Sequence, residues 1–224
     1  MATRLTPPRG AGAGAGGEIA RIAGILASVT LLSASAVALA AAVAPTLHSR
    51  YLPWITGRSL GIAAYLCLAG LVALGLVLRH PWRQRLRLHP ESLLRAHALL
   101  GTATLALVLA HVVALASDRY AGVGWLGAVL PGLSRYRTGA VALGVIAFAL
   151  LLAVAGTARL AGRLGARHWR WFHHLAGVVL VLVWFHGVLA GTDTAALRGL
   201  YVGSAAVLVA LAATRALAGP PLAP

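Results

Sequence analysis

The chain has 224 residues, of which 60% are hydrophobic, and its mean hydropathy is +0.86. A water-soluble domain of this size would expose large apolar patches with such a composition, so a soluble globular protein is excluded. A formal net charge of +15 would suggest a nucleic-acid ligand in a soluble protein, but here the arginines stand at the ends of apolar stretches and in loops. We therefore expect an integral membrane protein that binds no nucleic acid.

Six apolar stretches are long enough to cross a hydrocarbon core of about 30 Å at about 1.5 Å per residue. They are predicted at Ile19–Val43, Ser59–Arg79, Glu91–Ala116, Thr138–Leu160, Trp169–Ala190 and Gly199–Leu217. We predict an all-α integral membrane protein, a bundle of six transmembrane helices forming one domain over residues 19–217. Residues 1–18, rich in Gly, Ala and Pro, are predicted to be a disordered cytoplasmic tail, and residues 218–224 a short C-terminal tail.

The first stretch is either a membrane anchor or a cleaved signal peptide, since small residues between Ala38 and Ala44 would suit cleavage. Its apolar run is longer than the roughly 7–15 residues of a signal peptide, so we expect an anchor.

The arginines divide unequally between the two sides of the predicted bundle. Twelve share the side of both termini, against six on the other (Arg50, Arg58, Arg119, Arg135, Arg137 and Arg198). The positive-inside rule then predicts a multi-pass protein of the cell membrane with both termini in the cytoplasm, whose third and fifth helices both run outward.

Two features lie at the ends of the third predicted helix. The sequence His89-Pro90-Glu91 suits a helix start, because proline is tolerated in the first turn and an acid there complements the helix dipole. The loop after the helix, residues 117–137, has an apolar middle. It is either a short segment lying on the outer membrane face or a plain loop.

Five of the nine histidines fall within apolar stretches, where an ionisable side chain is costly and usually marks a site. The third helix carries His97 and His111, 14 residues or about 21 Å apart, and the fifth carries the doublet His173–His174 and His186, about 20 Å further on. Because the third and fifth helices run in the same direction, these histidines form two levels of paired imidazoles, with His97 level with the doublet and His111 level with His186. The other four, His48, His80, His89 and His168, lie in loops or at helix ends and need no site.

Paired neutral imidazoles suit the two axial positions of a haem iron, and a six-coordinate iron favours electron transfer. The only cysteine is Cys67, so no CxxCH motif attaches haem covalently. A zinc or copper site fits less well, because the ligands are split between two depths and all four acidic residues lie at helix ends or in loops. We predict two b-type haems between helices three and five.

Helical geometry leaves two questions open. At about 100° per residue, 14 steps return to within about 40° of the starting face, but 13 steps miss it by about 140°. The fifth helix must therefore bend, bulge or approach its ligands from different sides. Spacing does not choose between His173 and His174.

These residues resemble the ferric reductase-like transmembrane domain, the six-helix haem module of ferric reductases and NADPH oxidases. The histidines 14 apart match the family's third helix, and WFHHLAGVVLVLVWFHG from Trp171 to Gly187 is similar to its HHL motif with a later histidine before glycine. The resemblance implies that His97 and His173 bind the inner haem iron and that His111 and His186 bind the outer one. His174 is then a supporting residue.

Several side chains near these histidines have two interpretations. Arg95 and Arg170 lie where they can pair with propionates of the inner haem, and Arg119, Arg135 and Arg137 where they can do so outside, but extension toward lipid headgroups explains all five equally well. Trp184 and Phe185 either line an electron path or simply pack, and packing is the stronger expectation.

A second resemblance is to the haem-bearing membrane subunit of the bacterial methionine sulfoxide reductase system, in Thr56-Gly57-Arg58 and in the segment 164–173. That subgroup lacks a histidine at the position of His97, so the two-haem arrangement is favoured. Full-length reductases and oxidases continue into flavin and nicotinamide domains, which we do not expect in this chain; neither FAD nor NAD(P)H would be bound.

The resemblance implies an oxidoreductase component that takes electrons from a separate cytosolic flavoprotein or from quinol and passes them to ferric iron, oxygen or a partner enzyme outside. The arginine-rich loops would suit an acidic flavoprotein surface. Two alternatives stay open. One is a quinol-linked subunit of a periplasmic methionine sulfoxide reductase-type system, and the other is a non-redox haem carrier or assembly protein.

Overall fold

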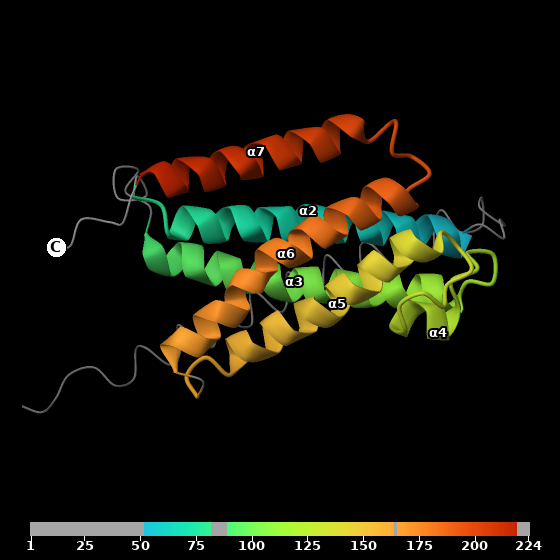
Figure 1. The fold of residues 1–224 in the computed structure, drawn as a ribbon, viewed down its shortest axis with the longest axis horizontal. Helices are drawn as coiled ribbons and strands as arrows, with labels where there is room; N and C mark the ends of the chain where they lie inside the picture. Colours follow the sequence, from blue (N-terminus) through green and yellow to red (C-terminus); the bar gives the residue numbers. More distant parts are fainter. Residues whose placement is uncertain (1–51, 82–88, 164, 219–224) are drawn as a thin grey trace, which may run out of the picture. The chain divides into compact units, whose positions relative to one another are not determined.

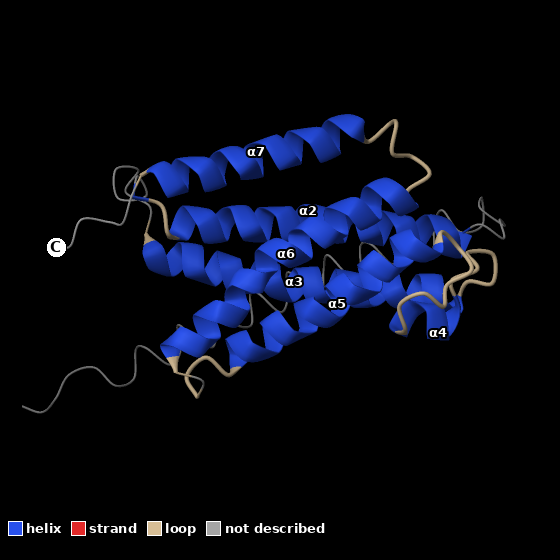
Figure 2. Ribbon diagram, viewed as in Figure 1, coloured by secondary structure: helices blue, strands red, loops and turns tan. Residues whose placement is uncertain are grey.

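The computed structural model describes residues 52–81, 89–163 and 165–218. The chain divides into two compact units, Met1–Leu52 and Pro53–Pro224, and the described residues belong to the second apart from Leu52. They form six α-helices and no strand (Figures 1 and 2): α2 (Leu52–Leu78), α3 (Pro90–Ser117), α4 (Gly124–Val129), α5 (Thr138–Arg159), α6 (Ala166–Ala190) and α7 (Arg198–Leu217). The predicted tail 1–18 and the predicted first span, Ile19–Val43, lie outside the described residues.

All the described helices except α4 are long and apolar enough to cross a membrane. These five correspond to the second to sixth predicted stretches, and many of their large apolar side chains are exposed, as expected where lipid covers the outer faces. The chain is therefore a multi-pass membrane protein with five candidate spans among its described residues. The all-helical class predicted from composition is confirmed.

Two helix starts illustrate how local sequence sets the boundaries. The third predicted helix begins as expected, with His89 as N-cap, Pro90 in the first turn and Glu91 beside it. The second begins at Leu52, seven residues before the predicted Ser59, because Pro53 suits a first turn although the polar Arg58 ends the apolar run. Arg58 consequently lies within a helix and not in a loop.

Contacts between neighbouring helices define how the described part of the chain packs. Helices α5 and α6 lie side by side (Figure 1), and the buried Leu68, Ala147, Leu151 and Val179 form one apolar core among α2, α5 and α6. Helix α3 packs against α2, where Gly70 faces Leu100. Helix α7 joins α2 through a hydrogen bond between the hydroxyls of Tyr65 and Ser204.

A second contact between α2 and α7 lies beyond the end of α2. The buried His80 places its Nε2 3.4 Å from the hydroxyl of Thr214 on α7. Burial, together with the neighbouring Arg215, lowers the pKa of this imidazole below its ordinary value of 6.5. The neutral form of His80 is therefore favoured at pH 7.

The loop between α3 and α5 contains the short helix α4. Gly127 sits so close to the backbone of Ser134 that a Cβ would lie 2.7 Å from its Cα, so the turn requires glycine there. Gly127 and Ala128 are buried, whereas Trp125, Leu126 and Val129 are 58%, 69% and 63% exposed. The outward face of α4 is therefore apolar, as an interfacial segment requires.

We predict that this face lies in the interface of the bilayer. The fluorescence of Trp125 is the difference between the wild-type protein and the Trp125→Phe variant. In vesicles that contain lipids brominated along the acyl chains, this fluorescence should be strongly quenched, because an inserted indole is close to the bromine atoms. Equal quenching by a water-soluble quencher such as iodide would show a solvent-facing loop instead.

Candidate functional site

His111 of α3 and His186 of α6 face each other with ring centroids 6.3 Å apart and planes at 80°. The Nδ1 of His111 lies 2.6 Å from the carbonyl oxygen of Gly57 on α2, and the Nδ1 of His186 lies 2.8 Å from that of Ala140 on α5. A carbonyl can only accept, so each Nδ1 must carry the proton and donate it. Each Nε2 then retains its lone pair, which is the form that binds a metal.

Two glycines make room for these imidazoles. A Cβ at Gly61 would lie 2.7 Å from Cε1 of His111, and a Cβ at Gly144 would lie 2.7 Å from Nδ1 of His186. Each glycine stands four residues after the residue whose carbonyl accepts the bond, Gly57 or Ala140. The ring therefore lies against bare helix backbone, where it reaches a carbonyl that side chains normally screen. We call each carbonyl with its glycine a cradle.

His97 of α3 and His173 of α6 form the other pair, with ring centroids 6.0 Å apart and planes at 61°. Trp169, one turn earlier on α6, stacks on the His173 ring at 5.3 Å. The Nδ1 atom of His173 is buried without a hydrogen-bond partner, and His97 has only a weaker interaction with the Leu71 backbone. This pair, unlike that of His111 and His186, is held by packing.

The structure separates the two members of the doublet. His174 points its Nε2 toward Nη1 of Arg79, 3.4 Å away near the end of α2, and it is His173 that lies beside His97. The structure thus brings together the two pairs that the family resemblance implied.

Helix α6 is one continuous α-helix from Ala166 to Ala190, so no bulge interrupts it between its histidines. It crosses α3 obliquely in Figure 1. His173 and His186 therefore reach the histidines of α3 from different faces of α6, the third of the three solutions that the spacing left open.

A cavity of about 170 Å³ opens beside His111 and His186. Its wall is predominantly apolar, and small residues of two helices flank the imidazoles: Gly61 and Ala64 on α2, and Gly144 and Ala147 on α5. A flat apolar group can approach the two Nε2 atoms only where such small side chains leave space. Arg58 and Asp193 stand among the polar lining residues.

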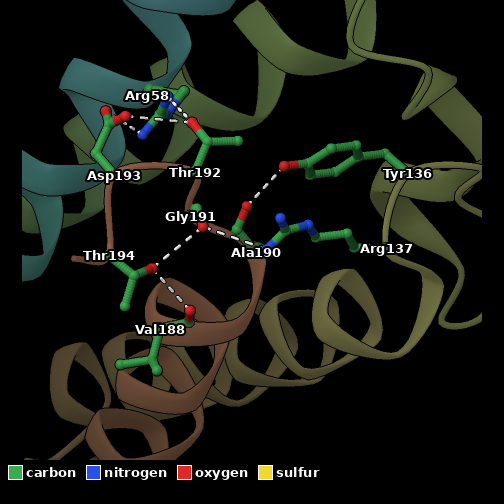
Figure 3. Close-up of polar contacts among 9 residues, drawn as sticks. All are labelled: Arg58, Tyr136, Arg137, Val188, Ala190, Gly191, Thr192, Asp193 and Thr194. Carbon is green, nitrogen blue, oxygen red and sulfur yellow. Dashed lines mark hydrogen bonds and ion pairs between the residues drawn. The ribbon is translucent and has the colours of Figure 1, made fainter.

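Arg58 is a site residue that sequence reasoning missed. Its guanidinium donates to the hydroxyl of Thr192 and to the carboxylate of Asp193 in the loop after α6 (Figure 3). Its side chain is 19% exposed, against 54% for that of Asp193. The sequence placed Arg58 in a loop, and only the earlier start of α2 reveals a cation inside a span, which is the usual sign of a function.

Two residues just before α5 cap the carbonyls at the end of α6. The Tyr136 hydroxyl donates to the Ala190 carbonyl at 2.7 Å, and Nη1 of Arg137 donates to the Gly191 carbonyl at 3.2 Å (Figure 3). Nη1 of Arg137 also donates to the Leu189 carbonyl at 2.5 Å. Arg137 has a left-handed backbone with φ 37°, an uncommon conformation for this residue. Its guanidinium thus serves the end of α6, an alternative to both roles expected from the sequence.

Replacing Arg137 with alanine should lower the free energy of unfolding by about 1–3 kcal/mol, because two charged hydrogen bonds to helix-end carbonyls are lost. Thermal unfolding in detergent would measure the loss. Arg135→Ala is the control, since it removes a neighbouring charge without touching the cap. Equal melting temperatures for both variants would show that the cap contributes nothing.

The remaining predicted residues have partners of their own or are exposed. Arg95 bonds the carboxylate of Glu91 on its own helix at 3.5 Å, and Arg170 is exposed. Trp184 donates its indole N–H to the Tyr201 carbonyl at 3.0 Å and packs edge-on against Phe185, which favours the packing role. The described residues contain no cluster of three or more His, Cys, Asp or Glu side chains; histidines meet there in twos.

The family model described as "Ferric reductase like transmembrane component" matches residues 60–184, more than half of the chain. The match covers His97, His111 and His173 and ends two residues before His186. Comparison with curated proteins and with solved structures found no significant match. The chain belongs to the ferric reductase-like transmembrane component family, which implies haem-based electron transfer across a membrane.

Proposed function

We propose that this chain carries electrons across the membrane through two b-type haems, one between His97 and His173 and the other between His111 and His186. The observation that supports this best is the repeated geometry of the two pairs. Each joins α3 to α6, and the ring centroids are 6.0 Å apart in one and 6.3 Å in the other.

This separation suits a shared metal ion. A metal–imidazole bond is about 2.0 Å long and a ring centroid lies about 1.1 Å from its nitrogen, so two imidazoles on opposite sides of one ion have centroids about 6 Å apart. Direct packing of two aromatic rings covers the same range, and distance alone does not choose. The choice rests on two partly buried, ionisable rings at each level of an apolar bundle, where packing alone would favour hydrocarbon side chains.

The surroundings of the pairs fit haem in three further respects. Fixing Nδ1–H at His111 and His186 leaves both Nε2 lone pairs for an iron. The cradles keep space beside the rings that a Cβ would fill, and the adjoining cavity has an apolar wall. The imidazoles of His97 and His173 make no strong hydrogen bond that would compete with a metal ion, which supports coordination.

The four histidines would hold the two haem irons, and a haem held by two imidazoles would supply single-electron transfer. The apolar helices around the pairs would exclude water. Because the two pairs lie 14 residues apart on α3, they divide the span into two levels. His97 and His111 thus set the depth of each haem.

We further propose that both termini are cytoplasmic and that electrons enter at the His97 level from a separate flavoprotein or from quinol. Arg95 and Arg170 would pair there with the haem propionates, Arg95 by leaving Glu91. The acceptor outside would be ferric iron, oxygen or a partner enzyme. The chain is then a component of an oxidoreductase system.

An absorption spectrum with haem quantification tests the proposal. Protein purified from haem-sufficient cells should show, after reduction, the separate α and β absorption bands of low-spin b-type haem. It should contain about two haems per chain. A haem-free preparation would refute it. Haem that exchanges readily and that neither reduced flavoprotein nor quinol reduces would indicate a carrier, and quinol-driven reduction with a co-purifying enzyme would indicate a quinol-linked subunit.

A further inference from the structure

The two histidine pairs are held in unlike ways, although both join the same helices. At His111 and His186 both Nδ1 atoms donate to main-chain carbonyls, whereas Nδ1 of His173 has no hydrogen-bond partner and His97 has only a weaker interaction with the Leu71 backbone. A buried donor without a partner is costly, so this contrast requires an explanation in the neighbouring helices.

The two cradles occupy equivalent places on α2 and α5. Residues 57–68 read GRSLGIAAYLCL and residues 140–151 read AVALGVIAFALL, with Leu, Gly, Ala and Leu in common at the fourth, fifth, eighth and twelfth positions. The first residue of each segment supplies the carbonyl and the fifth is the cradle glycine. Two helices from different parts of the chain thus present the same surface, each to one histidine of the same pair.

The other pair meets a looser contact on α2 and a different surface on α5. On α2, Gly75 stands four residues after Leu71, the residue whose backbone interacts with His97, but a Cβ at Gly75 would lie 3.4 Å from Cε1 of His97, an ordinary contact, so the ring does not press against the backbone there. On α5, the antiparallel course that sets Ala140 opposite His186 brings Ala153 to the level of His173. Thr157, four residues later, donates its hydroxyl to the Ala153 carbonyl at 2.9 Å. Threonine thus stands where the cradle has glycine.

We propose that Gly61 and Gly144 are positioning residues, which let His111 and His186 donate Nδ1–H to the helix backbone and so set the reduction potential of the haem between them. The inference rests on the proposed function. A hydrogen bond from Nδ1 makes the imidazole a more basic ligand, and a more basic ligand stabilises the ferric state. The cradles therefore lower the reduction potential of this haem and leave that of the other haem unaffected.

Redox titration of the purified holoprotein tests this. Gly61→Ala and Gly144→Ala each add one methyl group, which forces one imidazole away from its carbonyl. Each variant should raise the midpoint potential of one haem, or release that haem, while the other keeps its wild-type potential. The two substitutions act on the same haem from opposite sides, so both should shift the same component of the titration.

Gly75→Ala and Gly156→Ala are the matched controls, since the first adds a methyl at ordinary contact distance and the second adds one where no atom lies within 4 Å. Both should titrate as wild type. Unchanged potentials in Gly61→Ala and Gly144→Ala would overturn the proposal, and so would loss of both haems in both variants, because the glycines would then serve the bundle as a whole. Wild-type protein without haem would instead refute the proposed function.

Discussion

Replacing His111 with alanine is expected to halve the haem content, from about two haems per chain to about one. The His111 imidazole lies within an apolar bundle. Among the histidines of the described residues, only its partner His186 lies at the same level. A haem left with one axial ligand in a cavity open to small molecules is weakly held. Transfer of electrons to an outside acceptor should then fall to background, since one of two levels is missing.

His186→Ala should give the same result, and the double variant should lose no more haem than either single variant, because both residues hold one haem. His168→Ala, which removes an exposed histidine in the first turn of α6, is the control. Pyridine haemochrome quantification on equal amounts of folded protein measures the content. Retention of two haems in His111→Ala would refute the assignment, and loss of three quarters or more in the double variant would refute a shared site.

Periodicity and hydropathy predicted the spans well because lipid imposes a single requirement on each of them, a long run of apolar residues. The same signal failed at the start of α2, where Pro53 and Trp54 extend the helix past Arg58. At α4 the apolar middle of the loop left a short interfacial segment and a plain loop equally open, since six residues among glycines carry no helical period. The first predicted span, Ile19–Val43, lies outside the described residues and stays a prediction.

The histidines were visible in the sequence because ionisable side chains stand out in apolar helices, but their supports were not. Gly57 and Gly61 differ in nothing from the other glycines of α2 until α3 is packed against them, since a carbonyl acceptor belongs to every residue type. Arg58 likewise looked like a topology signal in a loop, because its contacts with the loop after α6 are not visible in the sequence. Contacts between segments more than 40 residues apart decide these roles, and a single sequence does not encode them in any local pattern.

The doublet on α6 offers the sharpest test of the site, because its two members differ in one residue of sequence and in everything around them. His173→Ala should remove the haem that it shares with His97, leaving about one per chain. His174→Ala should leave both haems bound, because its imidazole faces Arg79 and not His97. The adjacent positions share helix propensity, depth and hydropathy, so a general effect on folding would strike both variants alike.

Haem quantification and the low-temperature spectrum of the reduced protein measure the outcome, with His97→Ala as the reference for loss of the same haem. His173→Ala and His97→Ala should leave the same residual spectrum, since each leaves only the haem between His111 and His186. Haem loss in His174→Ala with retention in His173→Ala would reverse the assignment of the ligand. Because one residue of slip turns a helix by about 100°, that result would require α6 to be rotated about its axis from the position described here.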